Sequence, residues 1–227
     1  MRLAALLLLA STATAQPSPP DALPDSVRHE LQLELRQMNA ADQRARYMSL
    51  AGTFSPCVAD SLQRVLQGFP IEESIAVRQR IRAEAAARTT PQERALLVRM
   101  MRATDAANLA RLREIIDAHG WPSDERTGAD VSPVVFLLHA PHAMDEMRAT
   151  LLAEVQAGRL PGRELAMALD KSRKVRGELQ LYGTGDEYDA ATQALAPPRV
   201  ADLGVTNAAR RELGLPPLGE GEYRLAE

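Results

Sequence analysis

Two polar side chains interrupt the apolar face of a long predicted helix. If residues 91–119 are helical, successive side chains are about 100° apart. The apolar members of one face are then Leu97, Met101, Leu112 and Ile115. Asp105 and Asn108 lie on this same face. Because burying a carboxylate or an amide without partners costs several kcal/mol, we expect both to meet other polar groups inside the protein. Carboxylates in such a position can transfer protons or bind cations.

A second predicted helix, residues 25–50, repeats this pattern. Its apolar face contains Leu31 and Leu35, Asp42 lies on that face, and Arg46 follows Asp42 by four residues. On one helix alone, an Asp–Arg pair one turn apart is typical of a solvent-exposed surface. Because the same anomaly occurs in two helices, we expect Asp42 and Asp105 to meet in the interior.

His139 adds a titratable side chain at the end of an apolar segment, residues 134–138, that is typical of a buried helix. A lone core histidine with one hydrogen bond is the common outcome. Beside Asp42, Asp105 and Asp170, however, His139 can act as a general base or a metal ligand. Because no close ligand spacing such as H-x-x-x-H occurs, the sequence assigns neither a metal nor a cofactor.

Further candidate binding residues lie in the C-terminal half of the chain. Asp170 falls off the apolar face of a predicted helix over 161–176, toward a groove or solvent. If the backbone is extended, one face carries Gln180, Tyr182 and Thr184, and this face either binds a ligand or is exposed to solvent. Arg210, on a short helix over 206–213, can hold an anionic group, pair with an acid or face solvent.

The composition excludes some classes of protein. The chain has 27 basic and 30 acidic residues and a net charge of −3, which disfavours a nucleic-acid binder. Only 4% of residues are aromatic, so the core is aliphatic, which favours helices. The single cysteine, Cys57, cannot form a disulfide within the chain, and its neighbours favour a small buried side chain over a reactive thiol.

The N-terminus has the pattern of a secretory signal peptide. A basic start is followed by an apolar run over 3–10 and a small-x-small site over 13–15. The run is too short to span a bilayer permanently. We therefore predict cleavage before Gln16 and a periplasmic or secreted protein with no membrane segment. Residues 16–24 form a Pro-rich lead-in, 25–90 the N-terminal helices and 91–227 a helical core that carries the motifs, with 25–227 as one globular unit.

Start and stop signals divide the chain into helices. Asp25 is expected to cap the first helix, Thr90 and Glu93 form a capping box, and Gly120 ends the long helix. Other predicted helices cover 60–67, 72–88, 134–138, 143–157, 161–176 and 206–213. Residues 178–182 alternate as a strand, with 197–200 as its partner. These signals predict a mainly α, multi-helix orthogonal bundle with a small β-hairpin near the Tyr182-Gly183-Thr184 motif.

Several short motifs occur together in this chain. They are Asp42-Gln43-x-x-Arg46, Asp105-x-x-Asn108, Ile115-Ile116, Gly120-Trp121-Pro122, His139-Ala140, Asp170, Gln180-x-Tyr182-Gly183-Thr184, Arg210-Arg211 and Leu213-Gly214-Leu215. With this set, residues 38–223 resemble a bacterial family catalogued as domain of unknown function 6624. The resemblance implies a mostly helical domain with these residues gathered at one place, and it implies no activity. The chain departs from the family pattern at Leu138, Pro141, Lys171 and Gly185, where Gln, Asp, Arg and Gln are usual.

Three functions fit these residues. The first is a hydrolase that uses water, in which Asp105 or Asp42 works with His139 as acid and base, and Arg46, Gln180 and Tyr182 hold the substrate. Water is the expected nucleophile because no Ser, Cys or Thr has recognisable flanking residues. The second is a non-catalytic protein that binds a small polar ligand or a peptide end. The third is a structural network that fixes helix register.

Overall fold

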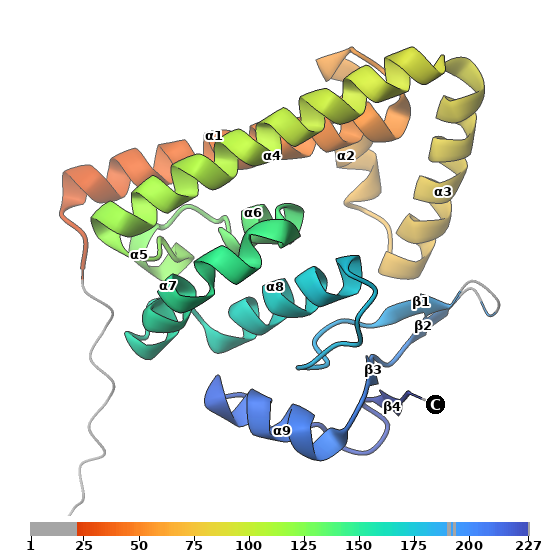
Figure 1. Ribbon diagram of the computed structural model, residues 1–227. Coiled ribbons are helices and arrows are strands. Elements are labelled where there is room, and N and C mark those ends of the chain that lie inside the picture. The colour runs from red at the N-terminus through yellow and green to blue at the C-terminus, as the bar shows by residue number, and fades with distance from the viewer. Residues whose placement is uncertain (1–21, 190–191, 193, 227) are drawn as a thin grey trace, which may run out of the picture.

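The computed structural model describes residues 22–189, 192 and 194–226. The predicted signal peptide and most of the lead-in therefore lie outside the described residues. The helices are α1 (Asp25–Ala51), α2 (Pro56–Leu66), α3 (Ile71–Arg88), α4 (Pro91–His119), α5 (Asp124–Thr127), α6 (Val134–His139), the 3₁₀ helix η1 (Pro141–Ala143), α7 (Met144–Gln156), α8 (Gly162–Val175) and α9 (Leu203–Glu212). The strands are β1 (Glu187–Asp189), β2 (Ala194–Ala196), β3 (Arg199–Val200) and β4 (Arg224–Leu225). The protein is mainly helical, as predicted (Figure 1).

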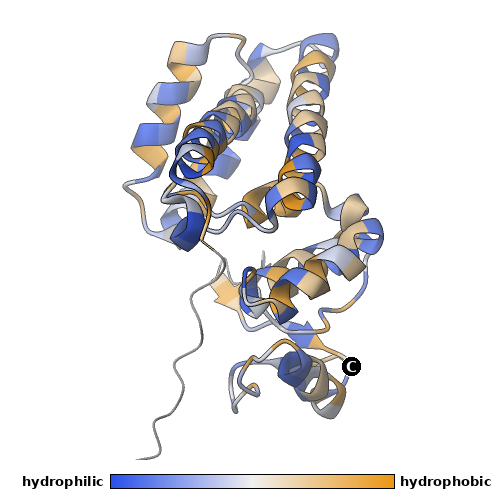
Figure 2. Ribbon diagram, turned by 90° about the vertical axis from the view of Figure 1, so that its left-hand side faces the viewer, coloured by the Kyte–Doolittle hydropathy of each residue, from blue (hydrophilic) through white to orange (hydrophobic). Residues whose placement is uncertain are grey.

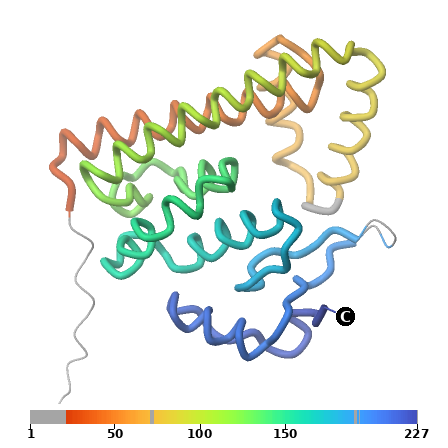
Figure 3. The backbone as a smooth tube through the Cα atoms, in the orientation of Figure 1, coloured from red at the N-terminus to blue at the C-terminus, as the bar shows by residue number. Residues whose placement is uncertain are grey.

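The two longest helices, α1 and α4, lie side by side and antiparallel, as the tube in Figure 3 shows. The predicted bounds of α4 are confirmed. Thr90 Oγ1 accepts from the backbone N–H of Glu93, and the Glu93 carboxylate accepts from the backbone N–H of Thr90, so the capping box is formed. At the start of α1 the prediction was wrong by one residue: Pro24 occupies the cap position, and Asp25 is the first helical residue.

Two apolar clusters hold the helices together. The larger includes Leu35, Leu112, Trp121 and Phe136 and lies where α1, α4, α6, α7 and α8 meet. The smaller lies between α1, α2 and the first half of α4. Helix α3 lies outside the larger cluster, and its Val77 and Ile81 pack against the smaller one. In Figure 2 hydrophobic and hydrophilic residues recur along each helix, as expected of amphipathic helices. None of the described helices is long and apolar enough to cross a membrane.

Helix α2 differs from the prediction in two ways. It begins earlier, at Pro56, because proline suits the first turn of a helix. Cys57 in that turn is exposed, so the expectation of a buried cysteine was wrong. The apolar neighbours of Cys57 do not bury it because α2 turns only Ala59 and Leu66 fully inward.

The predicted strand over 178–182 is not formed. Only Gln180 makes an isolated bridge, to Val200. The small sheets lie further along the chain: β1 and β2 form an antiparallel hairpin, and β3 pairs with β4 in parallel. The backbone N–H groups of Leu181 and Tyr182 donate to the Asp170 carboxylate instead of to a neighbouring strand. A local side-chain acceptor thus replaces the strand partner that the alternation suggested.

Helix α8 packs closely on the end of α9 at Gly162. A Cβ atom at this position would overlap the backbone oxygen of Leu213. We expect Gly162→Ala to lower the free energy of unfolding by about 2 kcal/mol, because the backbone of Leu213 must move. Urea denaturation measures this change. Gly68→Ala is the control, since its Cβ would lie at an ordinary 3.6 Å from its nearest neighbour. Equal losses in both variants would contradict the close contact.

Candidate functional site

The side chains of Asp42, Arg46, Asp105 and His139 meet between α1, α4 and the end of α6. Arg46 Nη2 donates to Asp42 Oδ1 at 3.2 Å and to Asp105 Oδ1 at 2.5 Å. Arg46 Nε lies 3.3 Å from Asp42 Oδ2. The two acids on the apolar helix faces therefore share one guanidinium inside the protein, which confirms that they meet there.

His139 is oriented by Asp42. His139 Nδ1 lies 2.8 Å from Asp42 Oδ1 and 2.9 Å from Arg46 Nε. A protonated Nδ1 donates to Asp42, whereas an unprotonated Nδ1 accepts from Arg46. We assign the proton to Nδ1, because Arg46 Nε has Asp42 Oδ2 as another acceptor and a buried carboxylate binds donors strongly. The other ring nitrogen of His139, Nε2, then carries the free lone pair of a base.

Burial separates the roles of the two acids. The Asp42 side chain is 1% exposed, whereas that of Asp105 is 12% exposed and that of His139 is 22% exposed. Arg46, Asp105 and His139 line a cleft of about 820 Å³, and Asp42 does not. Asp42 thus lies behind His139, while Asp105 and His139 can reach a molecule in the cleft.

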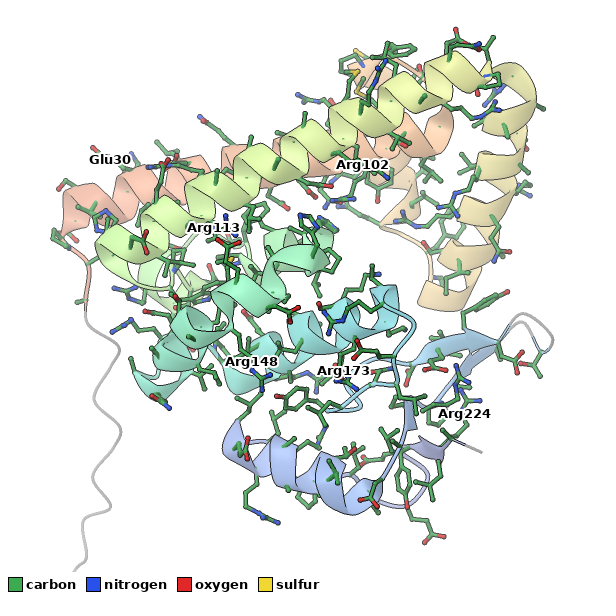
Figure 4. The ribbon with its side chains drawn as sticks, viewed as in Figure 1. Glu30, Arg102, Arg113, Arg148, Arg173 and Arg224 are labelled. Atoms are coloured by element: carbon green, nitrogen blue, oxygen red, sulfur yellow. The ribbon has the colours of Figure 1, made fainter. Side chains whose placement is uncertain are left out.

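One face of α4 forms a wall of this cleft. Its members, spaced by three or four residues as one helix face requires, are Met101, Arg102, Asp105, Ala106, Leu109, Ala110 and Arg113. Figure 4 labels Arg102 and Arg113 on this helix. The opposite side is formed by residues 138–142 and by Lys171 of α8. The small side chains of Ala106 and Ala110 leave room between the two sides.

The two carboxyl groups differ in proton affinity. Burial raises the pKa of Asp42, but the hydrogen bond to His139 and the charges of His139 and Arg46 outweigh burial, so this pKa lies below its ordinary value. Burial also raises the pKa of Asp105. Arg46 opposes this rise and the charge of Asp42 adds to it, and the pKa of Asp105 ends above its ordinary value. Of the two acids, Asp105 is therefore the one that more readily carries a proton.

The same side chains have the donor types of a metal site. Asp42, Asp105 and His139 each offer one ligand atom, and these atoms lie within 4.8 Å of one another. Arg46 Nη2, however, already donates to both carboxylates. A divalent cation at this point would have to displace the guanidinium. The arrangement thus favours a cluster neutralised by a cation of the protein itself.

Asn108, the other polar residue on the apolar face of α4, has a structural contact. Its side-chain nitrogen donates to the backbone oxygen of Met38 at 3.3 Å, and the residue is 6% exposed. Asn108 therefore links α4 to α1 one turn away from Asp105 and does not line the cleft.

Asp170 anchors the loop over residues 180–185 instead of joining the cluster around Arg46. Its Oδ1 accepts from the backbone N–H groups of Leu181 and Tyr182, and its Oδ2 accepts from the backbone and the hydroxyl of Thr184. The residue is 2% exposed, so the solvent-facing alternative drawn from the helix pattern was wrong. The burial of Asp170 could not be seen from the apolar face of the helix, because Asp170 packs against backbone N–H groups and not against apolar side chains.

The other predicted binding residues lie in the same loop or, like Arg210 of α9, contact it. Gln180 exchanges two side-chain hydrogen bonds with the backbone of Gly185, and Arg210 Nη1 donates to the backbone oxygen of Tyr182 at 2.7 Å. Gln180 and Tyr182 are each 2% exposed, so the alternative of a solvent-exposed face was wrong. Most of the predicted site residues thus fall into two groups, the cleft around Arg46 and this loop, instead of the one place that the resemblance implies, and Asn108 belongs to neither.

The sequence patterns did not indicate several residues of the cleft. Arg102, Arg113 and Lys171 line the cleft together with the predicted residues. For α4 the sequence does contain a signal for the cleft. Two arginines flank two alanines at helical spacing, on the side of the helix that carries Asp105. Of the four departures from the family pattern, Leu138, Pro141 and Lys171 line the cleft. The backbone of Gly185 instead forms hydrogen bonds with the side chain of Gln180.

Comparison with known proteins places the chain in a family. The profile of a family of unknown function, DUF6624, matches residues 59–227. The matched region contains Asp105, His139 and the Asp170 loop, and it begins after Asp42 and Arg46. No curated protein and no solved structure matches the chain. The chain therefore belongs to the DUF6624 family.

Proposed function

We propose that this protein is a hydrolase in which His139, oriented by Asp42, removes a proton from water in the cleft. The observation that carries the proposal is the 2.8 Å contact of His139 Nδ1 with a buried carboxylate, while the imidazole itself lines the cleft. A carboxylate behind a histidine fixes the ring and stabilises the imidazolium that forms when the ring takes a proton. Asp42 is thus a positioning residue.

The proposed reaction uses groups on both sides of the bound substrate. The water oxygen forms a bond to the electrophilic atom of the substrate, and the water proton passes to His139 Nε2. Asp105, in its protonated form, donates a proton to the leaving group as the bond to that group breaks. One water is consumed and two products leave.

Arg46 is placed to stabilise negative charge that develops on the substrate. Its Nη2 is engaged by the two carboxylates, whereas its Nη1, among the described residues, contacts only the Met101 sulfur, at 3.5 Å. Sulfur is a weak acceptor, so the N–H groups of Nη1 are available to a substrate oxygen.

Activity of the purified protein on a panel of esters, amides, phosphomonoesters and phosphodiesters tests the proposal. On a substrate that the parent turns over, His139→Gln is expected to lower kcat about 10³-fold, because it removes the base. His29→Gln, on the exposed face of α1, is the matched control and should leave kcat unchanged. The proposal is wrong if the parent turns over nothing in the panel or if His139→Gln retains the parental rate. A ligand that stabilises the fold and is recovered intact would favour the non-catalytic binding protein.

A further inference from the structure

The cleft has a local excess of basic side chains. Its lining contains the cationic residues Arg46, Arg102, Arg113 and Lys171, and among the described residues Asp105 is its one carboxylate. The whole chain, in contrast, has a net charge of −3. The charge of the lining is thus opposite in sign to that of the protein, which indicates a local preference for anions.

Two of these cations are not neutralised by neighbouring acids. Arg46 is paired with Asp42 and Asp105, and Arg113 pairs with Glu146 at 2.8 Å. Arg102 and Lys171 are exposed, and neither makes an ion pair or a side-chain hydrogen bond within the part of the chain that the structure describes. Arg102 belongs to α4 and Lys171 to α8, so both helices bring a cation to the cleft that is available to an anionic group of a ligand.

The imidazoles of His139 and His142 also line the cleft. The rest of the lining is aliphatic. It consists of Met101, Ala106, Leu109, Ala110, Leu138, Ala140 and Pro141. Among the described residues that line the cleft there is no Phe, Tyr or Trp, so the cleft lacks a large aromatic surface on which a base could stack. A cleft of about 820 Å³ has the size that receives small molecules.

We infer that the molecule bound in this cleft is a small amphiphilic anion, with a carboxylate or phosphate group attached to an aliphatic portion. Arg102 and Lys171 bind the anionic group, and the aliphatic portion lies on Ala106, Leu109 and Leu138. This inference names the substrate class of the proposed hydrolase, and so rests on that function for the reaction but not for binding. Arg102 precedes Asp105 by three residues, about 4.5 Å along the helix axis. The hydrolysed bond therefore lies close to the charged group.

Calorimetric titration at low salt tests the inference with four probes: hexanoate, hexyl phosphate, hexanol and acetate. At least one of the six-carbon anions is expected to bind about tenfold more tightly than both hexanol, which lacks the charge, and acetate, which lacks the chain. The tighter of the two anions identifies the head group. Added salt should weaken the binding of the anions but not that of hexanol.

Matched double variants assign the binding to this cleft. Arg102→Gln with Lys171→Gln should weaken the anion about tenfold, since two exposed cationic contacts are lost. Arg99→Gln with Lys174→Gln removes the same charge from exposed positions of the same two helices outside the cleft, and should leave the affinity unchanged. The inference is overturned if no six-carbon anion binds, if hexanol or acetate binds as tightly, or if both double variants weaken binding equally.

Failure of this inference is distinguishable from failure of the proposed reaction. The His139→Gln variant keeps Arg102 and Lys171, so it should bind the anion with the parental affinity and lose only turnover. Anion binding together with parental turnover by this variant would remove the hydrolase and leave the anion site standing. If turnover depends on His139 but the cleft shows no preference for anions, the anion site is wrong and the hydrolase remains.

Discussion

Asp170→Ala is expected to lower the free energy of unfolding by about 4 kcal/mol, with a fall in melting temperature of about 10 °C. The Asp170 carboxylate is buried and accepts four hydrogen bonds, three from backbone N–H groups and one from the Thr184 hydroxyl, at 2.8 to 3.0 Å. Alanine would leave these donors without an acceptor, and each unsatisfied buried donor costs about 1–3 kcal/mol. Partial exposure of the loop to water keeps the expected loss below the sum.

Asp170→Asn separates charge from hydrogen bonding. The amide oxygen can still accept from two donors, whereas the amide nitrogen faces donors in place of an acceptor, so a loss of about half that of alanine is expected. Asp117→Ala, at an exposed position of α4, is the control and should change stability by less than about 0.5 kcal/mol. Thermal and urea denaturation followed by circular dichroism measure all three variants. A stable Asp170→Ala protein would show that the loop keeps its shape without this carboxylate.

Helix α8 contributes one residue to the loop and the next residue to the cleft, so substitutions at these two positions can test the loop and the cleft separately. Asp170 faces the loop and its neighbour Lys171 lines the cleft. Substitutions at Lys171 should therefore change binding at constant stability, and conservative substitutions at Asp170 should change stability first. Adjacent helical residues point about 100° apart, so α8 can serve both groups at once.

Helix α4 and the contact between the two acids could be predicted from the sequence because each depends on local chemistry. The capping box at Thr90 and Glu93 and the stop at Gly120 fix the ends of α4 without help from the rest of the chain. Asp42 and Asp105 could be found because a carboxylate on an apolar face is energetically unfavourable unless it has a partner. Cap signals and helical periodicity were enough for both.

The absence of a strand over 178–182 and the exposure of Cys57 could not be predicted in the same way. Alternation indicates an extended backbone, but whether it pairs with a strand depends on what else accepts its N–H groups, here the carboxylate of Asp170. The apolar neighbours of Cys57 do not reveal which side of α2 faces the core. Arg102 and Lys171 look like any exposed basic residues until the packing of α4, α6 and α8 brings them to one cleft.

Asp42→Asn and Asp105→Asn are expected to differ in their effect on stability at pH 7. Asp42 is almost fully buried and paired with both Arg46 and His139, so loss of its charge should lower the free energy of unfolding by about 3 kcal/mol. Folding disfavours the ionised form of Asp105, because burial and the charge of Asp42 raise its pKa despite Arg46. Asp105→Asn removes that unfavourable charge, and the amide oxygen can still accept from Arg46, so no loss is expected.

The pH dependence of these differences gives the stronger test. The folded-state pKa of Asp42 lies below its unfolded value, so the stability it contributes is complete above about pH 4 and is lost as the pH falls further. The deficit of Asp42→Asn should therefore shrink at pH 3. The folded-state pKa of Asp105 lies above its unfolded value, so its unfavourable effect is absent below about pH 4 and grows as the pH rises. Urea denaturation at pH 3, 5 and 7 measures both differences, and groups common to all three proteins cancel. If Asp105→Asn lost as much stability as Asp42→Asn at pH 7, both acids would be equal partners of Arg46, and Asp105 would not be the one that carries a proton.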